Sequence, residues 1–504
     1  MRTLYRASRV HTLGHPPMGE WILIDDRHVQ RVGSGDPPAA DRIVELPGCT
    51  ILPGFIDAHV HLTSTGVAME NEDVAVARSA KELLAIAAAR ATGGTERVVA
   101  LQGYDETRWD DPTLPSLADL DAVTADPLVI RRTDGHLALA NSAALTFAEA
   151  LETPGVERDH EGRPTGRVTR EANRQVGQWI ASARTVHRIE ELQLLGAGVA
   201  ATRGVTAVHE MALPLEAGIR DVEVLLAHRA RLPVAVEVVL GTMDVPKAAE
   251  LGLGAIGGDL AVDGSIGART AALSTPYADG EGRGVVYFDD EVLEGFFQDG
   301  HDAGLQVGMH AIGDRAIEQV LAAWERVYHR LDSRERRHFR ARRHRIEHFE
   351  MPSDEQVERT AMLGLAISMQ PTFDFEWGHP GGLYAQGVGA ERADAMNPVR
   401  LLLERGVVLG VGSDAPVVAM DPWLTIHALE HHHDPGQRLS RAEAIRIHTA
   451  GSARLAHQEE KKGVLEPGMH ADLAVYDTDP LEVDDVRALR PTMTVSLGRE
   501  VWLA

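Results

Sequence analysis

Short apolar segments alternate with amphipathic segments through most of the chain. Residues 305–310 and 407–411 are apolar runs bounded by glycine or polar residues, as expected of buried strands. After the first of them, apolar residues recur at helical spacing, at Ile317, Val320, Leu321, Trp324 and Val327. Strands that alternate with helices in this way predict a parallel sheet. Seven or eight such units predict an α/β fold of the (β/α)8 TIM-barrel type.

The other segments with a strand pattern support the same architecture. They are residues 204–209, 232–240, 343–348 and 365–369. Ser353 and Gln356 form a capping-box pattern, which predicts a helix that begins there and ends at Gly364. Ser440 and Glu443 predict the start of another helix in the same way.

The two ends of the chain have a different pattern. Residues 21–25, 43–46, 472–477 and 492–496 resemble short strands between turns rich in Gly, Pro and Asp. Neither end has enough apolar surface to fold alone. We therefore expect residues 1–53 and 456–504 to combine into one small β-sandwich domain, with the barrel in residues 54–455.

One stretch does not fit the repeating pattern. Residues 69–185 contain a helix pattern from Ser79 to about Arg90 and then loops rich in Asp and Pro. We interpret this stretch as a large insertion near the mouth of the barrel.

Composition restricts the function further. The 504 residues are 44% hydrophobic and 25% charged, which is ordinary for a globular protein, and the net charge is −25. This acidic balance argues against nucleic acid or an anionic membrane as a partner. The chain shows neither a signal peptide nor an apolar run near the ~20 residues of a membrane span, so we expect a cytoplasmic protein. The single cysteine, Cys49, excludes a cysteine-based metal cluster.

Histidines and an aspartate lie where the predicted strands end. Strand alternation places His59 and His61 on one face, where two imidazoles can bind one divalent metal. His310, His348 and Asp414 each follow a later strand. The carboxyl ends of barrel strands converge on one face, so these five side chains predict a metal site there.

The chain resembles the amidohydrolase superfamily, in particular the amidohydrolase-3 group that contains YtcJ-like proteins and N-substituted formamide deformylases. The resemblance covers nearly the whole chain. The matching stretches are 52–61 (LPGFIDAHVH), 131–136 (RRTDGH) with Asn141 and Ser142, 263–273 (DGSIGARTAAL), 310–317 (HAIGDRAI), 345–348 (RIEH), 412–416 (GSDAP) and 463–473 (GVLEPGMHADL). It implies that His59, His61 and Asp414 hold a first metal. His310 and His348 would hold a second metal or assist with the first.

The sequence departs from the family at one position. Many relatives bridge two metals with a carboxylated lysine just before the Asp-Gly-Ser motif, where this chain has Asp259. None of its four lysines ends a predicted strand. Asp259 or Glu210 could supply the bridging carboxylate, or the site could hold one metal, or it could be degraded. We favour one metal.

The resemblance and the ligand types together imply a metal-dependent hydrolase. Histidine and carboxylate ligands favour zinc, which lowers the pKa of a bound water toward ~7. Asp414 would accept the water's proton and pass it to the leaving nitrogen, while His310 or His348 stabilises the oxyanion. The expected reaction is hydrolysis of a non-peptide C–N bond in a small N-acyl or N-formyl amide.

Residues that contact the substrate are harder to predict. His136, Arg269 and Trp109 are the candidates, although a core position fits Trp109 equally well. The histidines at 431–433 could suggest a further metal site, but consecutive residues do not share a helical face, so we interpret them as surface residues.

Two other functions remain open at this stage. A site with one metal also resembles deaminases of small heterocycles, which place a glutamate three residues after the equivalent of His310, where this chain has Gly313 followed by Asp314. A non-catalytic protein on a degraded barrel would not need all five ligands. A homodimer is expected only from base rates.

Overall fold

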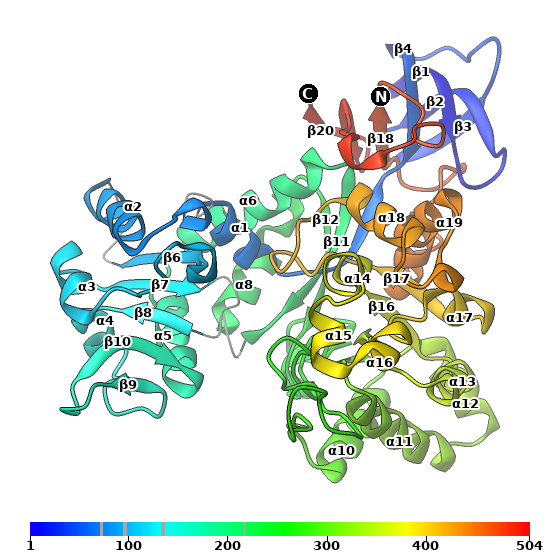
Figure 1. Ribbon diagram of the computed structural model, residues 1–504. Coiled ribbons are helices and arrows are strands. Elements are labelled where there is room, and N and C mark those ends of the chain that lie inside the picture. The colour runs from blue at the N-terminus through cyan, green and yellow to red at the C-terminus, as the bar shows by residue number, and fades with distance from the viewer. Residues whose placement is uncertain (71–73, 94–97, 133–136, 215–217) are drawn as a thin grey trace. The chain divides into compact units, whose positions relative to one another are not determined.

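The computed structural model describes residues 1–70, 74–93, 98–132, 137–214 and 218–504 (Figure 1). The chain divides into two compact units. The first contains residues 1–61, 197–213 and 228–504, and the second contains residues 62–196 and 214–227. The second unit is therefore longer than the predicted insertion, and it includes a short segment that follows a barrel strand.

Eight parallel strands of the first unit form the barrel. Their order around the sheet is β17-β16-β15-β14-β13-β12-β11-β5. A parallel bridge between Val60 and Ala415 and a hydrogen bond from Asp414 N to His59 O (2.8 Å) join the two edge strands. The strands are β5 (Phe55–Val60), β11 (Val205–Ala212), β12 (Ala235–Leu240), β13 (Ala255–Ile256), β14 (Gln306–Ala311), β15 (Arg345–His348), β16 (Ala366–Met369) and β17 (Val408–Val411). The predicted TIM-type barrel is confirmed.

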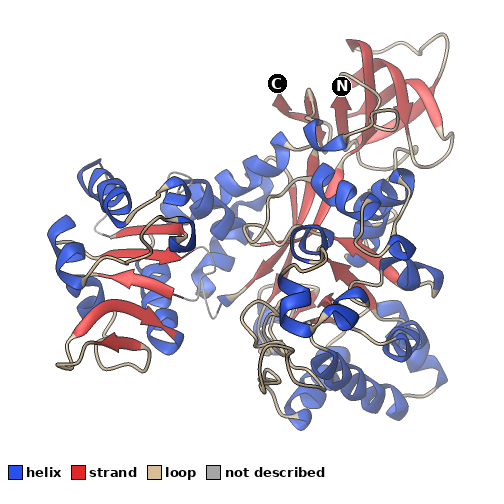
Figure 2. Cartoon of the chain, viewed as in Figure 1, coloured by secondary structure: helices blue, strands red, loops and turns tan. Residues whose placement is uncertain are grey.

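Helices follow the barrel strands and lie outside the sheet (Figures 1 and 2). The longest, α11, buries one face that includes the apolar series from Ile317 to Val327. The helices after β12 are α9 (Val245–Glu250), α10 (Asp290–Asp302), α11 (Asp314–Arg330), α12 (Ser333–Arg342), α13 (Asp354–Leu363), α14 (Pro371–Trp377), α15 (Leu383–Val388), α16 (Ala390–Asp394), α17 (Val399–Glu404), α18 (Pro422–Glu430), α19 (Arg441–Arg446) and α20 (Ser452–Leu455).

Helix α13 begins and ends where the sequence predicts. The Ser353 side chain accepts a hydrogen bond from Gln356 N (3.2 Å), and the Gln356 side chain accepts one from Ser353 N (2.9 Å). Gly364 ends the helix in the left-handed region, with φ 71°. Both ends of this helix are thus determined by local residues.

Strands from the two ends of the chain share one seven-stranded sheet in the order β20-β19-β18-β4-β1-β2-β3. The long strand β4 joins the halves, because it pairs with β1 on one side and β18 on the other. The strands are β1 (Arg2–His11), β2 (Met18–Asp25), β3 (His28–Gly33), β4 (Arg42–Pro53), β18 (Leu473–Tyr476), β19 (Met493–Ser496) and β20 (Arg499–Leu503). Hydrogen bonding thus yields one continuous sheet where the sequence analysis expects a two-layered sandwich.

The second unit has its own five-stranded sheet, in the order β6-β7-β8-β10-β9. The sequence analysis missed these strands, because they are short and several include arginine or glycine. The strands are β6 (Val99–Tyr104), β7 (Leu128–Arg132), β8 (Leu137–Ala140), β9 (Val156–Arg158) and β10 (Pro164–Thr169). The helices are α1 (Leu62–Glu70), α2 (Ala80–Gly93), α3 (Leu117–Val123), α4 (Ser142–Phe147), α5 (Arg170–Ala183), α6 (Val186–Thr202) and α8 (Ile219–His228), of which the ends of α6 and α8 belong to the first unit.

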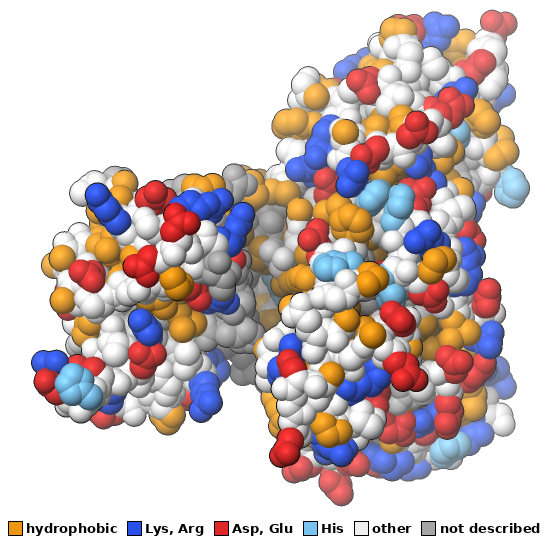
Figure 3. All heavy atoms as spheres, viewed as in Figure 1, with side chains coloured by type: hydrophobic (Ala, Val, Ile, Leu, Met, Phe, Trp, Pro, Cys, Tyr) orange, Lys and Arg blue, Asp and Glu red, His pale blue; other side chains and the backbone are white. Residues whose placement is uncertain are grey.

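On the face drawn in Figure 3, acidic and basic side chains are interspersed. Within the described residues, no helix combines the length and apolarity that crossing a membrane requires.

Candidate metal centre

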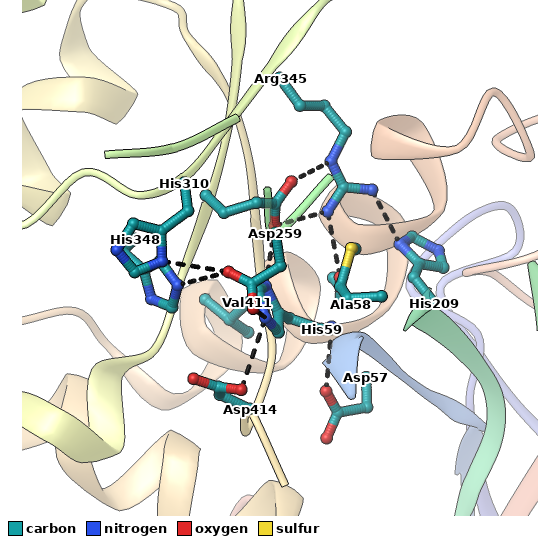
Figure 4. A network of polar contacts seen from close by, with 12 residues as sticks. Asp57, Ala58, His59, His209, Asp259, His310, Arg345, His348, Val411 and Asp414 are labelled. Carbon is teal, nitrogen blue, oxygen red and sulfur yellow. Dashed lines mark hydrogen bonds and ion pairs between the residues drawn. The ribbon is translucent and has the colours of Figure 1, made fainter. Parts of the chain in front are cut away.

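The five predicted ligands come together at the carboxyl ends of four barrel strands. His59 lies on β5, and His61 is the first residue after that strand. His310 lies on β14, His348 ends β15 and Asp414 follows β17. All are buried or nearly so. These side chains therefore converge, as the sequence pattern predicts, and Figure 4 shows four of them, His59, His310, His348 and Asp414.

Three of the ligands form one compact group. Asp414 Oδ1 lies 3.5 Å from His59 Nε2 and 3.2 Å from His61 Nε2. Three ligand atoms at such distances can hold one ion. The group contains the residues that the resemblance assigns to the first metal.

Asp259 completes this group and connects it to the other two histidines. Its Oδ2 atom lies 3.7 Å from His59 Nε2 and 3.4 Å from His61 Nε2. Its Oδ1 atom lies 3.1 Å from both His310 Nδ1 and His348 Nε2. One carboxylate therefore contacts all four histidines, so Asp259 occupies the place between two pairs of ligands.

Two glycines direct Asp259 into the site. Gly257 and Gly258, just after β13, have φ values of 82° and 56°, in the left-handed region that favours glycine. A Cβ at Gly257 would lie 2.0 Å from Gly308 O, so no larger residue fits there. The turned chain then runs beside β14, where Ala261 bridges to His310. This turn, rather than strand periodicity, places Asp259.

The donor set fits a divalent metal. The Nε2 atoms of His59 and His61 each lie 3.2–3.7 Å from two carboxylate oxygens, Asp414 Oδ1 and Asp259 Oδ2. Ligands bound to zinc at about 2.0–2.2 Å in a tetrahedron lie about 3.3–3.6 Å apart. Among the described residues, His59 Nε2 and Asp414 Oδ1 are buried without a hydrogen-bond partner. A cation between them would satisfy both atoms.

The pKa shifts of the histidines also favour a cation at this site. Burial disfavours charged imidazoles, but Asp414 and Asp259 outweigh burial and raise the pKa of His59 to about 10. Burial is likewise outweighed at His310, where Asp259 raises the pKa to about 9. Burial and the neighbouring His310 instead lower the pKa of His348. Two adjacent buried carboxylates thus attract positive charge, which a metal ion can supply.

Two of the ligands have backbone in the left-handed region, where residues other than glycine are uncommon. The φ values are 69° at His348 and 58° at Asp414. Such strain concentrates at functional sites. At His348 it ends the strand and turns the side chain away from strict strand alternation.

Sequence analysis did not assign a role to the residues that support His59. Glu347 Oε2 lies 3.0 Å from His59 Nδ1, and Arg345 donates to both oxygens of Glu347. Asp57 Oδ1 accepts from Ser413 N (2.9 Å) and His59 N (3.3 Å). Burial raises the pKa of Asp57 to about 6. The signal that could have identified Glu347 and Arg345 is two charged residues inside a buried strand pattern.

Glu210 and Arg269 are the remaining candidates in the first unit. Glu210 is buried on β11, and no group of potential metal ligands among the described residues includes it. Arg269 donates to Asp279 (2.7 and 2.9 Å) and to Ile266 O (2.6 Å), so its guanidinium is occupied within its own loop. This internal pairing argues against its predicted role in substrate binding.

The candidates from the insertion are not placed at a site. Trp109 is buried in the core of the second unit, and its Nε1 donates to Ala77 O (3.0 Å). It is therefore a core residue rather than the predicted pocket residue. His136 lies outside the described residues.

The prediction that residues 431–433 are surface histidines is wrong for two of them. His432 is buried, and its Nε2 lies 3.0 Å from Asn397 O. His433 Nδ1 lies 2.5 Å from Asp374 Oδ1. Helix α18 ends at Glu430, so the three histidines do not follow helical spacing. This cluster joins the segments that follow β16 and β17.

Solved structures and known proteins share this architecture. A metal-dependent hydrolase from Pyrococcus horikoshii OT3 superimposes with a TM-score of 0.81 at 26% identity, over 97% of this chain and 99% of that one. The protein named amidohydrolase YtcJ of Bacillus subtilis is 26% identical over 551 aligned positions, covering 100% of this chain and 99% of YtcJ. The N-substituted formamide deformylase of Arthrobacter pascens is 25% identical, covering 92% of this chain and 90% of that enzyme.

The barrel and the histidine–carboxylate cluster at its carboxyl ends define the class of metal-dependent hydrolases. The chain belongs to the amidohydrolase family, whose model matches residues 42–502. It is thus a hydrolase that acts on carbon–nitrogen bonds other than peptide bonds.

Proposed function

We propose that this enzyme hydrolyses the C–N bond of a small N-acyl or N-formyl amide and uses one tightly held zinc ion. The observation that supports this most is the cluster of His59, His61, Asp414 and Asp259, whose histidine–carboxylate spacings of 3.2–3.7 Å fit the ligands of one zinc ion. The catalytic water would take a fifth ligand position, which zinc can add to these four. The relative from Arthrobacter pascens, named for deformylation of N-substituted formamides, supports the bond type.

The metal, when bound, would lower the pKa of water and polarise the scissile carbonyl. We assign the proton transfer to Asp414, because its Oδ1 lies 3.5 Å from His59 Nε2 and 3.2 Å from His61 Nε2 and so would lie beside the ion and its water. Its carboxylate would accept a proton from the attacking water and deliver it to the departing nitrogen. An amine is a poor leaving group unless it is protonated, so this transfer completes the cleavage.

One of the two histidines His310 and His348 would stabilise the developing oxyanion. Each uses one ring nitrogen on Asp259 Oδ1. Among the described residues, the other nitrogens, His310 Nε2 and His348 Nδ1, are buried without a hydrogen-bond partner. Burial is outweighed at His310, where Asp259 raises the pKa, so His310 Nε2 can bear a proton and donate a charge-assisted hydrogen bond to the substrate oxygen. The pKa of His348 is lowered by burial, so its one ring proton is on the nitrogen that faces Asp259.

Deamination of a heterocycle is the weaker alternative. At Gly313, where deaminases of this type have a glutamate, a Cβ would lie 2.0 Å from Ala272 O. The next residue, Asp314, is occupied, because its carboxylate accepts hydrogen bonds from Ser274 N and Oγ. The acid that would protonate a ring nitrogen is therefore missing from this position.

The test compares two substrate panels on zinc-loaded protein. We expect amine release from N-formyl and N-acyl amines, and little ammonia release from amino-substituted heterocycles. Asp414→Asn should reduce kcat by at least about 10²-fold, the size of effect that loss of a general base has. Ammonia release as the main activity, or full activity in zinc-loaded Asp414→Asn, would overturn the proposal.

A further inference from the structure

An ion pair lies in the interior of the barrel beneath the metal ligands. Arg345 and Glu347, both on β15, are almost completely buried, with side-chain exposures of 1% and 0%. Arg345 Nε donates to Glu347 Oε1 (2.8 Å) and Arg345 Nη2 donates to Glu347 Oε2 (3.0 Å). The interior of such barrels is normally filled by branched apolar side chains. A charged pair at this position therefore needs an explanation.

The pair connects β15 to strands on the other side of the barrel. Arg345 Nη2 also donates to Ala58 O (3.0 Å) on β5, and Arg345 Nη1 lies 3.3 Å from His209 Nδ1 on β11 (Figure 4). In the sheet, β16 and β17 separate β15 from β5. The guanidinium thus holds the strand of Glu347 at a fixed distance from the strand of His59.

Glu347 uses its second oxygen on His59. Its Oε2 lies 3.0 Å from His59 Nδ1, while His59 Nε2 faces Asp414 and Asp259. Because Glu347 is held as a carboxylate by Arg345, it can only accept a hydrogen bond, so Nδ1 must bear the proton. In the neutral imidazole that a metal ligand must be, the lone pair is then on Nε2, the atom that faces the other ligands.

We propose that Arg345 and Glu347 are positioning residues for the metal, because they fix His59 in the Nδ1-protonated tautomer with its ring turned toward the ion. Carboxylate partners of this kind orient metal-binding histidines and raise their basicity. The proposal rests on the metal site proposed above and extends it to residues that do not contact the ion.

Stability alone does not explain the pair. Taking two charges out of water is costly, and buried ion pairs replaced together by apolar residues often leave a protein equally or more stable. A role in stability predicts that variants lose thermal stability while the folded protein binds metal normally. A positioning role predicts that a variant in which both charges are removed keeps its thermal stability but binds metal more weakly.

The experiment measures zinc affinity by competition with a chromophoric chelator, and the melting temperature of the metal-free protein. Glu347→Gln should weaken zinc binding by about 10- to 100-fold, the usual effect of losing such a partner. The double variant Arg345→Met/Glu347→Leu should weaken it similarly while the metal-free protein still melts cooperatively. The control is Glu430→Gln, which removes a partly buried carboxylate that also pairs with an arginine, Arg441, away from the site.

The outcomes separate this proposal from the one on which it rests. If wild-type protein fails to bind zinc, the proposed metal site itself is wrong. If wild-type binds zinc and the folded variants bind it as tightly as Glu430→Gln does, only the positioning role is overturned. If neither variant folds, NMR of zinc-loaded wild-type protein labelled with ¹⁵N-histidine decides: a proton on His59 Nδ1 supports the role, and a proton on Nε2 with none on Nδ1 overturns it.

Discussion

Asp259 Oδ2 lies 3.4 Å from His61 Nε2, although 198 positions of sequence separate the two residues. The contact exists because the chain turns sharply after β13 and runs beside β14. Many relatives are expected to have a carboxylated lysine near this place. Here a shorter side chain reaches the same ligands, because the backbone itself brings the carboxylate inward.

Asp259→Ala should therefore impair metal binding. The change removes an oxygen from the ligand set and leaves His310 and His348 without their shared partner. We expect the metal content of purified protein to fall well below that of wild type, for which one equivalent is expected. Elemental analysis per folded chain checks this. The comparison variant is Glu210→Gln, the other carboxylate that the sequence suggests; normal metal content in Asp259→Ala with loss in Glu210→Gln would reverse the assignment.

Removal of the metal should destabilise the fold. The proposed ligands come from β5 and the residue after it, the turn after β13 and the segment after β17, so an ion bound only by the folded state links distant parts of the barrel. Free ion at about 100 times its dissociation constant adds about 2.7 kcal/mol to the free energy of unfolding. We expect a chelator to lower the melting temperature in calorimetry and added zinc to restore it. An unchanged melting temperature in protein shown to have lost its metal would contradict this linkage.

Gly313→Ala should strongly destabilise the protein. The new Cβ would lie 2.0 Å from Ala272 O, a backbone atom, so the chain must shift where α11 begins. Overpacking of this kind costs about 1–3 kcal/mol or more. Chemical denaturation measures the change in the free energy of unfolding. The matched control is Gly295→Ala in α10, where a Cβ meets no atom within 4 Å among the described residues. Alanine there should stabilise the helix by about 0.5–1 kcal/mol.

Periodicity predicted most of the barrel and part of the site. His59 and His61 share a face because strand side chains alternate, and this rule needs no knowledge of the fold. The same rule fails at His348, which alternation places with Ile346 and opposite Glu347. The left-handed backbone at His348 ends the strand, so both Glu347 and His348 contact the site. Left-handed conformations of this kind depend on tertiary contacts, which the sequence pattern does not contain.

The histidine cluster after α18 shows a second limit of sequence patterns. Consecutive histidines resemble a solvated turn, yet His433 binds Asp374 from a segment 59 positions earlier. Only the barrel topology, which places the loops after β16 and β17 side by side, brings the two together. The neighbouring sequence therefore could not predict which distant residue pairs with the buried His433.

This pair should make stability depend on pH. Burial disfavours the charged form of His433, but the hydrogen bond to Asp374 outweighs it and raises the pKa of the imidazole. Burial is also outweighed at Asp374, where His433 and His432 lower the pKa of the carboxyl. The histidine's contribution is complete below its unfolded pKa of about 6.5 and is lost as pH rises through the raised value. The aspartate's contribution is complete above about 3.9 and is lost as pH falls through the lowered value.

The interaction between His433 and Asp374 should therefore be strongest between about pH 4 and pH 6.5. We expect His433→Asn to lower the free energy of unfolding by about 1.5–3 kcal/mol at pH 5.5, the range for a hydrogen bond to a charged group, and by less at pH 9. Denaturation curves of wild type and variant at both pH values give the difference directly. His160→Asn, at a histidine whose side chain is 86% exposed, should show almost no loss at either pH. A loss in His433→Asn that is equal at both pH values would contradict a change in the charge of His433 between pH 5.5 and pH 9.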